Sequence, residues 1–223
     1  MMETLLSFDR DAMVWLNMGN AHTEGWNFFF WMVSQIAVWI PVFLVFLYII
    51  IKDKKQESVY IIAGIILLFV LCDQISSSLL KPLVARPRPS HDPLVMQLLS
   101  YVNDYHGGAF GFPSSHAANS FGFATFSVLL FRDKLYTLCA MLWAAICAYS
   151  RIYLGVHFPG DILCGTLLGI GIAFLCYWGM NKVMERFPKY VAPQSSYSKQ
   201  DIRLILFTLV VTLFVIGCSG VKY

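Results

Sequence analysis

Apolar residues run along this chain in six long blocks, and short polar connections separate the blocks. Crossing the hydrocarbon layer of a membrane takes about 20 helical residues, and roughly 17 are enough. The pattern therefore predicts an all-α, polytopic membrane helix bundle with about six transmembrane helices. The predicted spans are residues 28–51, 58–80, 115–131, 135–151, 160–180 and 202–219.

The third and fourth spans are short and carry small or polar residues such as Ser120, Thr125 and Ala144. Small residues let helix backbones approach closely. We therefore expect these two helices to pack inside the bundle. The sequence shows no internal repeat and no low-complexity tract, so we predict a single membrane-embedded domain over residues 1–223.

Residues 1–26 mix acidic and basic side chains with apolar ones. No apolar core led by lysine or arginine precedes a small-residue cleavage site, as a secretory signal would need. We expect an interfacial amphipathic helix that lies on the membrane surface, with Trp15 and Trp26 at headgroup level.

Composition supports the membrane assignment. Hydrophobic residues make up 58% of the chain and charged residues 13%, against about 25% charged in an ordinary soluble domain. The formal net charge of +3 is too small, and the cations are too scattered, to indicate a nucleic-acid partner. The six cysteines lie inside apolar runs, with the spacing of neither a zinc site nor a disulfide framework.

Lysine and arginine in short connections predict the orientation of the spans, because such residues are enriched on the cytoplasmic side. Ten of them follow the first, third and fifth spans, and six lie on the other side. We therefore expect the first set to face the cytoplasm and both termini to lie outside. The two sets are Lys52, Lys54, Lys55, Arg132, Lys134, Lys182, Arg186, Lys189, Lys199 and Arg203, against Arg10, Lys81, Arg86, Arg88, Arg151 and Lys222.

Three polar clusters then share the outer face. In the first, Lys81 closes the second span, and Arg88 follows seven residues later between two prolines. The prolines keep Arg88 out of a helix, and its planar guanidinium matches phosphate oxygens in a bidentate way. A positively charged loop that touches lipid headgroups is the alternative interpretation.

The second cluster, Ser114-Ser115-His116, opens the third span. Serine is a preferred helix cap, and the unpaired N–H groups of a first helical turn attract anions. His116 would lie one turn into that helix. The alternative is a simple serine cap with an interfacial histidine.

The third cluster combines Arg151, His157 and Asp161. Pro159 suits the first turn of the fifth span, which places His157 just outside the helix and Asp161 about three residues inside it. Asp161 could reach back in the manner of a capping box and hold one nitrogen of His157, which leaves the other nitrogen free for attack. The alternative is an aspartate cap beside an unrelated histidine.

Together the clusters resemble the three-part signature of the phosphatidic acid phosphatase type 2 family, K-x6-RP, P-S-G-H and S-R-x5-H-x3-D. All three sets of intervals match, and the resemblance covers residues from about 58 to 180. One position departs, because Ser115 stands where the family has glycine. We expect that position to act through its backbone N–H, which serine also supplies.

The resemblance implies a role for each matching residue. His157 would attack phosphorus and form a phosphohistidine, Asp161 would orient it, and His116 would protonate the leaving oxygen and then activate water. The implied phosphate-binding residues are Lys81, Arg88, Ser114, Ser115 and Arg151. No metal and no other cofactor is implied, because three cations neutralise the phosphate.

Other residues keep open roles. Asp73 lies inside the second span and either orients the site or pairs with a neighbouring helix. Arg86 is a candidate headgroup contact. We expect the connector of residues 90–112 to dip into the outer leaflet, and we interpret His91 and His106 as incidental.

These observations predict a metal-independent phosphatase for a membrane lipid that carries a phosphate monoester or a diphosphate. Undecaprenyl diphosphate is the first substrate hypothesis, and lipid A phosphate and phosphatidylglycerol phosphate are the others. The predicted place is a bacterial inner membrane, with the site facing the periplasm or cell exterior. Two other functions stay open: transfer of phosphate between lipids, and transport along intramembrane charges, although the two matching halves with broken helices that a transporter would have are not evident. Oligomeric state is not readable from the sequence.

Overall fold

A computed structural model describes residues 2–17, 22–187 and 197–220, which are helical apart from connecting loops and one isolated β-bridge. Lys189 and Lys222, two of the cations used to orient the spans, lie outside these residues, as do residues 1 and 18–21 of the N-terminal segment. The α-helices are α1 Met2–Leu16, α2 Glu24–Val33, α3 Ile40–Lys54, α4 Ser58–Asp73, α5 Lys81–Val84, α6 Ser115–Phe131, α7 Lys134–Tyr153, α8 Pro159–Arg186 and α9 Lys199–Gly220.

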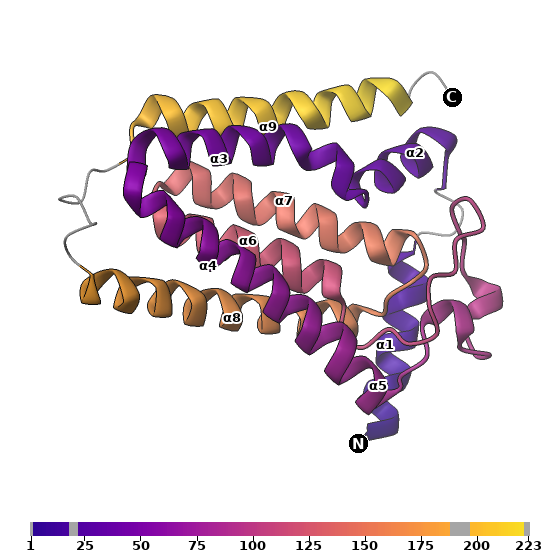
Figure 1. Cartoon of the computed structure of the whole chain (residues 1–223). Helices are drawn as coiled ribbons and strands as arrows, with labels where there is room; N and C mark the ends of the chain where they lie inside the picture. The colour runs from indigo at the N-terminus through magenta and orange to yellow at the C-terminus, as the bar shows by residue number, and fades with distance from the viewer. Residues whose placement is uncertain (1, 18–21, 188–196, 221–223) are drawn as a thin grey trace.

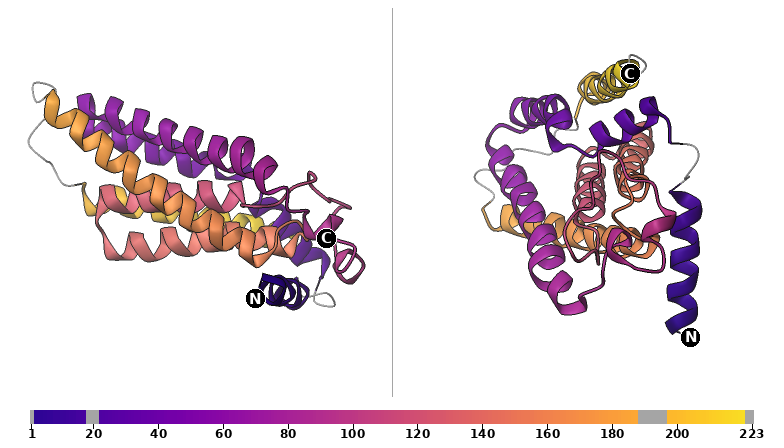
Figure 2. Two further views of the ribbon diagram at one scale, coloured as in Figure 1. Left: turned by 90° about the horizontal axis from the view of Figure 1, so that it is seen from below. Right: turned by 90° about the vertical axis from the view of Figure 1, so that its right-hand side faces the viewer.

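Six of these helices, α3, α4, α6, α7, α8 and α9, run roughly along one direction and form the bundle (Figure 1). Helix α1 instead crosses one end of the bundle, nearly at right angles to it (Figure 2). Its outer face carries Leu5, Phe8 and Trp15, all largely exposed, whereas Met13 is fully buried. This arrangement fits the predicted amphipathic helix at the membrane surface.

Within the described residues, four helical stretches are long and apolar enough to cross a membrane. They are Ile36–Val84, Lys134–Tyr153, Pro159–Arg186 and Lys199–Gly220. The first contains both α3 and α4, because the chain turns back through the 3₁₀ helix Lys55–Glu57 without losing helical structure. Helix α6 has 17 residues, which is at the lower limit for a span. The fold class is confirmed as an all-α membrane bundle.

The first predicted span, residues 28–51, is wrong as one continuous helix. Helix α2 ends at Val33, the short 3₁₀ helix Ile36–Trp39 follows, and α3 begins at Ile40. Pro41 lies in the first turn of α3. Since proline has no N–H to donate and its ring clashes with the preceding turn, an α-helix cannot continue smoothly through this point.

The second span also continues further than predicted. Helix α4 passes into a π-helix, Gln74–Leu80, and then into α5, so the helical stretch ends at Val84 rather than at residue 80. Lys81 therefore lies within the last helical turns. π-Helical segments inside α-helices are rare and are frequent at functional sites.

Helix α6 lies at the centre of the bundle, as its small residues predict. Ala117, Ala118 and Ala124 are fully buried. Two glycines of α8 let that helix approach closely: a β-carbon at Gly165 would collide with the carbonyl oxygen of Ser114, and one at Gly169 with that of Ala118. The start of α6 is thus fixed against the first turns of α8.

The two ends of the bundle differ in chemistry. At the end away from α1, Lys52 at the end of α3 donates to Asp201 at the start of α9, with 2.6 Å between Nζ and Oδ1. The loop and helix starts that carry the three polar clusters gather at the other end, where α1 also lies (Figure 1). The clusters therefore share one end of the bundle, as a single site requires.

Candidate active site

The site forms where the start of α6 meets the start of α8. The backbone N–H of Ser114 donates to the carbonyl oxygen of Asp161 at 3.0 Å. The Ser114 hydroxyl oxygen caps α6 by accepting from the N–H of Ala117 at 3.4 Å. The predicted serine cap is present, so the hydroxyl oxygen and amide of Ser114 already have partners within the fold.

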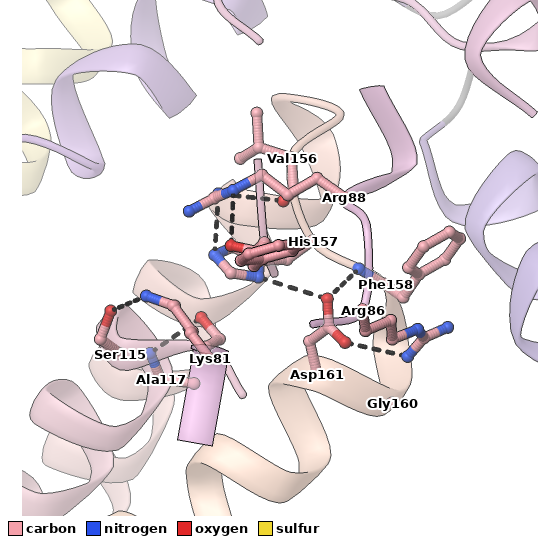
Figure 3. A network of polar contacts seen from close by, with 12 residues as sticks. Lys81, Arg86, Arg88, Ser115, Ala117, Val156, His157, Phe158, Gly160 and Asp161 are labelled. Carbon is pink, nitrogen blue, oxygen red and sulfur yellow. Dashed lines mark hydrogen bonds and ion pairs between the residues drawn. The ribbon is translucent and has the colours of Figure 1, made fainter. Parts of the chain in front are cut away.

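His157 and Asp161 form a buried pair at the start of α8 (Figure 3). Pro159 occupies the first turn of α8, as predicted. Oδ2 of Asp161 accepts from the backbone N–H of Phe158 at 3.0 Å, the carboxylate half of the predicted capping box. The same oxygen lies 3.4 Å from Nδ1 of His157. A carboxylate at Nδ1 favours the tautomer that carries its proton there and leaves Nε2 with a free lone pair.

The Nε2 atom of His157 points toward Arg88, whose Nη1 lies 3.1 Å away. Since a guanidinium only donates, this contact agrees with an unprotonated Nε2. Burial lowers the pKa of His157 well below its usual value, and the positive charges of Arg88, Arg151 and Lys81 lower it further. A lowered pKa means that the neutral imidazole, the form that can attack phosphorus, predominates at neutral pH.

Arg88 is held by backbone carbonyl groups, and its backbone is extended, as the flanking prolines predict. Its Nε donates to the oxygen of Phe110 at 3.2 Å, and its Nη1 donates to that of Val156 at 3.1 Å. An isolated β-bridge between Pro87 and Phe110 fixes the strand-like segment around it. The guanidinium therefore has a defined direction toward His157.

Lys81 reaches the start of α6. Its Nζ donates to the hydroxyl oxygen of Ser115 at 3.0 Å and to that of Ser77 at 3.3 Å. The Ser77 hydroxyl in turn donates to Oδ1 of Asp73 at 3.2 Å. Asp73, Ser77 and Lys81, four residues apart along one helical stretch, thus form a hydrogen-bonded chain that links the Asp73 carboxylate to the site.

Arg151 is 3% exposed, and its Cζ lies 5.6 Å from the centre of the Tyr105 ring. Its Nη2 is 3.5 Å from the Tyr105 hydroxyl. Its Nε is buried without a hydrogen-bond partner among the residues that the structure describes. A buried donor without a partner is costly, and a phosphate oxygen would satisfy it.

His116 is the second residue of α6, so it lies in the first helical turn rather than one turn into the helix as predicted. It lines a groove of about 500 Å³. Arg151, His157, Lys81 and Arg88 lie near enough to His116 for their charges to act on it, so the two histidines share one site. The groove is mostly apolar, and its walls come from the broken first span, α4, α6 and α7. Besides His116, its lining includes Ser34, Trp39, Phe69, Asp73, Asn119 and Trp143.

Arg86 differs from its sequence-based interpretation, and Asn17 is a buried polar residue that the sequence did not predict. Arg86 does not point outward to headgroups: it contacts Asp161, on the side opposite His157 (Figure 3). Asn17 was not recognised, although its side chain is fully buried. Its Nδ2 donates to the carbonyl oxygens of Ile152 and Tyr153, and its Oδ1 accepts from the N–H of Ser100. No sequence signal marks such a long-range contact.

The connector of residues 90–112 folds over the outer side of the site. Tyr105 covers Arg151, and the oxygen of Phe110 holds Arg88. Leu94 and Leu98 are 66% and 62% exposed, which suits the predicted contact with the lipid leaflet. His91 lies beside Ser90, and His106 lies beside Asp104. Neither histidine therefore joins Lys81, Arg88 and Arg151. Within the described part of the chain, no three His, Cys, Asp or Glu side chains gather as a metal site would need.

Comparison with known proteins identifies the family. The family model described as the PAP2 superfamily matches residues 58–185. The chain belongs to the PAP2 superfamily. It is a phosphatase of this family that acts on membrane lipid phosphates, which confirms the resemblance of the three polar clusters and the predicted class of enzyme.

The relatives that this chain covers over most of their length include a lipid A 4'-phosphatase. The lipid A 4'-phosphatase of Bacteroides thetaiotaomicron is 34% identical over 96% of this chain and 95% of its own length. The crystal structure of Aquifex aeolicus LpxE is 29% identical, with a TM-score of 0.54 over 74% of this chain and 92% of that one. A PAP2-type phosphatidylglycerolphosphate phosphatase from Bacillus subtilis shares the fold, with a TM-score of 0.60, 24% identity and coverage of 82% and 89%.

Proposed function

We propose that this PAP2 phosphatase hydrolyses a phosphate monoester of a lipid A-type glycolipid, using His157 as the nucleophile. The supporting observation is the meeting of a cationic pocket with an apolar groove at His116. The pocket suits the phosphate, and the groove suits the apolar part of a lipid. Similarity over almost the whole chain to a lipid A 4'-phosphatase favours this substrate over undecaprenyl diphosphate and phosphatidylglycerol phosphate.

In the first step Nε2 of His157 attacks phosphorus, and the bond from phosphorus to the lipid oxygen breaks as the N–P bond forms. His116, kept protonated by the negative charge of the bound phosphate, gives its proton to the departing oxygen. Lys81, Arg88 and Arg151 bind the phosphate oxygens, with the N–H groups at the start of α6 as further donors. Asp161 stabilises the positive charge that develops on His157.

In the second step His116, now neutral, takes a proton from water. The water oxygen attacks phosphorus, the N–P bond breaks, and inorganic phosphate leaves with His157 restored. Three cations near the phosphate supply the charge neutralisation that a divalent ion provides in other phosphoryl-transfer enzymes. Full activity in EDTA is therefore part of the proposal.

The test is a panel of purified lipid phosphates presented in detergent micelles with and without EDTA. The proposal expects the highest kcat/KM for lipid A that carries a 4'-phosphate, undiminished by EDTA and independent of an acceptor lipid. A higher kcat/KM for undecaprenyl diphosphate would overturn the substrate assignment. A requirement for an acceptor lipid would indicate a phosphotransferase instead.

The role of His116 makes a separate prediction. His116→Ala is expected to lower kcat for a lipid phosphate by about 10²- to 10⁴-fold, the usual contribution of a general acid. An aryl phosphate with a good leaving group needs no proton for departure, so its first step should be much less affected. A stopped-flow burst of aryl alcohol measures that step, and His91→Ala serves as the control. Equal losses on both substrates would contradict the acid role.

We also propose that the site faces the outside of a bacterial inner membrane. The end of the bundle away from the site carries the larger set of lysines and arginines, including Lys52 and Lys54, which are typical of the cytoplasmic side. His106 lies in the connector at the site end, and its side chain is 42% exposed. A membrane-impermeant thiol reagent added to spheroplasts should label His106→Cys above the wild-type background, and labelling only after lysis would reverse the orientation.

A further inference from the structure

The N-terminal helix α1 is connected to the active site through Arg86. Nη2 of Arg86 lies 2.6 Å from Oδ2 of Asp9, a residue of α1. Oδ1 of Asp9 accepts from the backbone N–H of Gly160, in the first turn of α8, at 2.8 Å. Asp9 therefore links Arg86 to the helix start that carries Asp161, although 151 positions separate Asp9 from Gly160 in the chain.

Arg86 also contacts Asp161 directly. Its Nη1 lies 2.9 Å from Oδ1 of Asp161, and its Cζ lies 4.1 Å from the centre of the Phe158 ring. Both terminal nitrogens are thus paired with carboxylates, and the side chain is 15% exposed. These contacts leave Arg86 poorly placed to bind a lipid headgroup and well placed to act on the His157–Asp161 pair.

The two oxygens of Asp161 have different partners. Oδ2 faces His157 and the N–H of Phe158, whereas Oδ1 faces Arg86. The residue has no exposed surface, and a buried carboxylate stays ionised only if nearby charges or donors offset its lost hydration. The other titratable groups that face Asp161 or Arg86 are Lys81, Arg88, His157, Cys164 and Asp9.

Three positively charged residues lie near Asp161: Lys81, Arg86 and Arg88. Lys81 and Arg88 belong to the proposed phosphate pocket, so a bound phosphate neutralises part of their charge. Arg86 lies on the far side of Asp161 from that pocket (Figure 3). Its charge therefore remains directed at the two aspartates throughout the reaction. We propose that Arg86, held by Asp9 of α1, is a positioning residue that keeps Asp161 ionised and aimed at His157.

This inference rests on the proposed role of Asp161 in the phosphatase mechanism, and it makes α1 part of the site. The test measures kcat for a water-soluble aryl phosphate between pH 5.5 and 9, so that no lipid has to bind. In Arg86→Met, Asp161 loses the positive charge that offsets its burial, so it should remain protonated up to a higher pH than in the wild-type protein. We expect kcat at pH 6 to fall on the order of 10- to 100-fold, the loss that follows removal of a partner that orients a metal-ligating side chain, which is a comparable positioning role.

At pH 9 the loss in Arg86→Met should be several-fold smaller, because the acid limb of the profile has moved to higher pH. Arg86→Lys should restore part of the activity at pH 6, since an ammonium supplies the charge to one carboxylate. Asp9→Asn should lower kcat at pH 6 by less than Arg86→Met does, because Arg86 then keeps its contact with Asp161 but loses its partner on α1. Arg86→Met/Asp161→Asn should be no slower than Asp161→Asn alone, because Arg86 acts through Asp161.

Arg10→Gln is the matched control. Arg10 also ties α1 to the site loop, with its Nε 2.9 Å from Oδ2 of Asp92, but it does not contact Asp161. If the arginines only dock α1, Arg10→Gln and Arg86→Met should lower activity alike at every pH. Any one of three results would overturn the inference: equal losses in these two variants at every pH, an acid limb that does not shift in Arg86→Met, or additive effects of Arg86→Met and Asp161→Asn. Failure of the wild-type protein to release phosphate would instead overturn the proposed function.

Discussion

Replacement of His157 by glutamine is expected to lower phosphate release by the order of 10⁴-fold or more, because it removes the nucleophile itself. Glutamine is of similar size and keeps a polar group beside Arg88, so the fold should tolerate it. Incubation with a radiolabelled substrate followed by rapid quenching should trap a phosphoenzyme in the wild-type protein and none in the variant.

The control for this prediction is His106→Gln, which changes a histidine that is exposed and paired with Asp104 outside the site. It should keep wild-type turnover and phosphoenzyme. Thermal unfolding of both variants in detergent separates lost chemistry from lost structure. Turnover by a folded His157→Gln protein at a wild-type rate would contradict the nucleophile assignment.

Gly165→Ala is expected to cause the second large loss, through packing rather than chemistry. The added methyl group would meet the carbonyl oxygen of Ser114 and the β-carbon of Ala117. Neither atom can move without shifting the start of α6, where the proposed anion-binding N–H groups lie. Overpacking of this kind typically costs about 1–3 kcal/mol, and we expect a lower unfolding temperature together with loss of most activity.

The same helix offers a matched control in Gly171→Ala. A β-carbon at Gly171 meets no other heavy atom within 4 Å, so the identical chemical change should leave the unfolding temperature and turnover near wild-type values. Similar behaviour of the two variants would show that close packing of α8 on α6 does not position the site.

The sequence predicted well those parts of the site that depend on local backbone rules. Ser114 caps α6, Pro159 opens α8, and the prolines around Arg88 keep it extended, because each outcome follows from helix-end chemistry within a few residues. The chain from Asp73 to Lys81 was also predictable, since residues four apart share a helix face.

Longer-range features could not be predicted in this way. The pairing of Arg86 with Asp9 joins residues 77 positions apart, and neither residue belongs to a periodic pattern that would place its partner. Asn17 is a similar case. The break in the first span has a local signal, Pro41, but the length and hydropathy of the surrounding apolar run favour one continuous helix.

The break in the first span has a consequence for how the two products separate. It contributes Ser34 and Trp39 to the apolar groove that reaches His116. Under the proposed function, the dephosphorylated lipid is therefore released where its chains are already dissolved. Inorganic phosphate has no comparable solubility in hydrocarbon and departs into water. Each turnover thus sends its products into two immiscible phases, which dilutes them away from each other and opposes resynthesis of the ester.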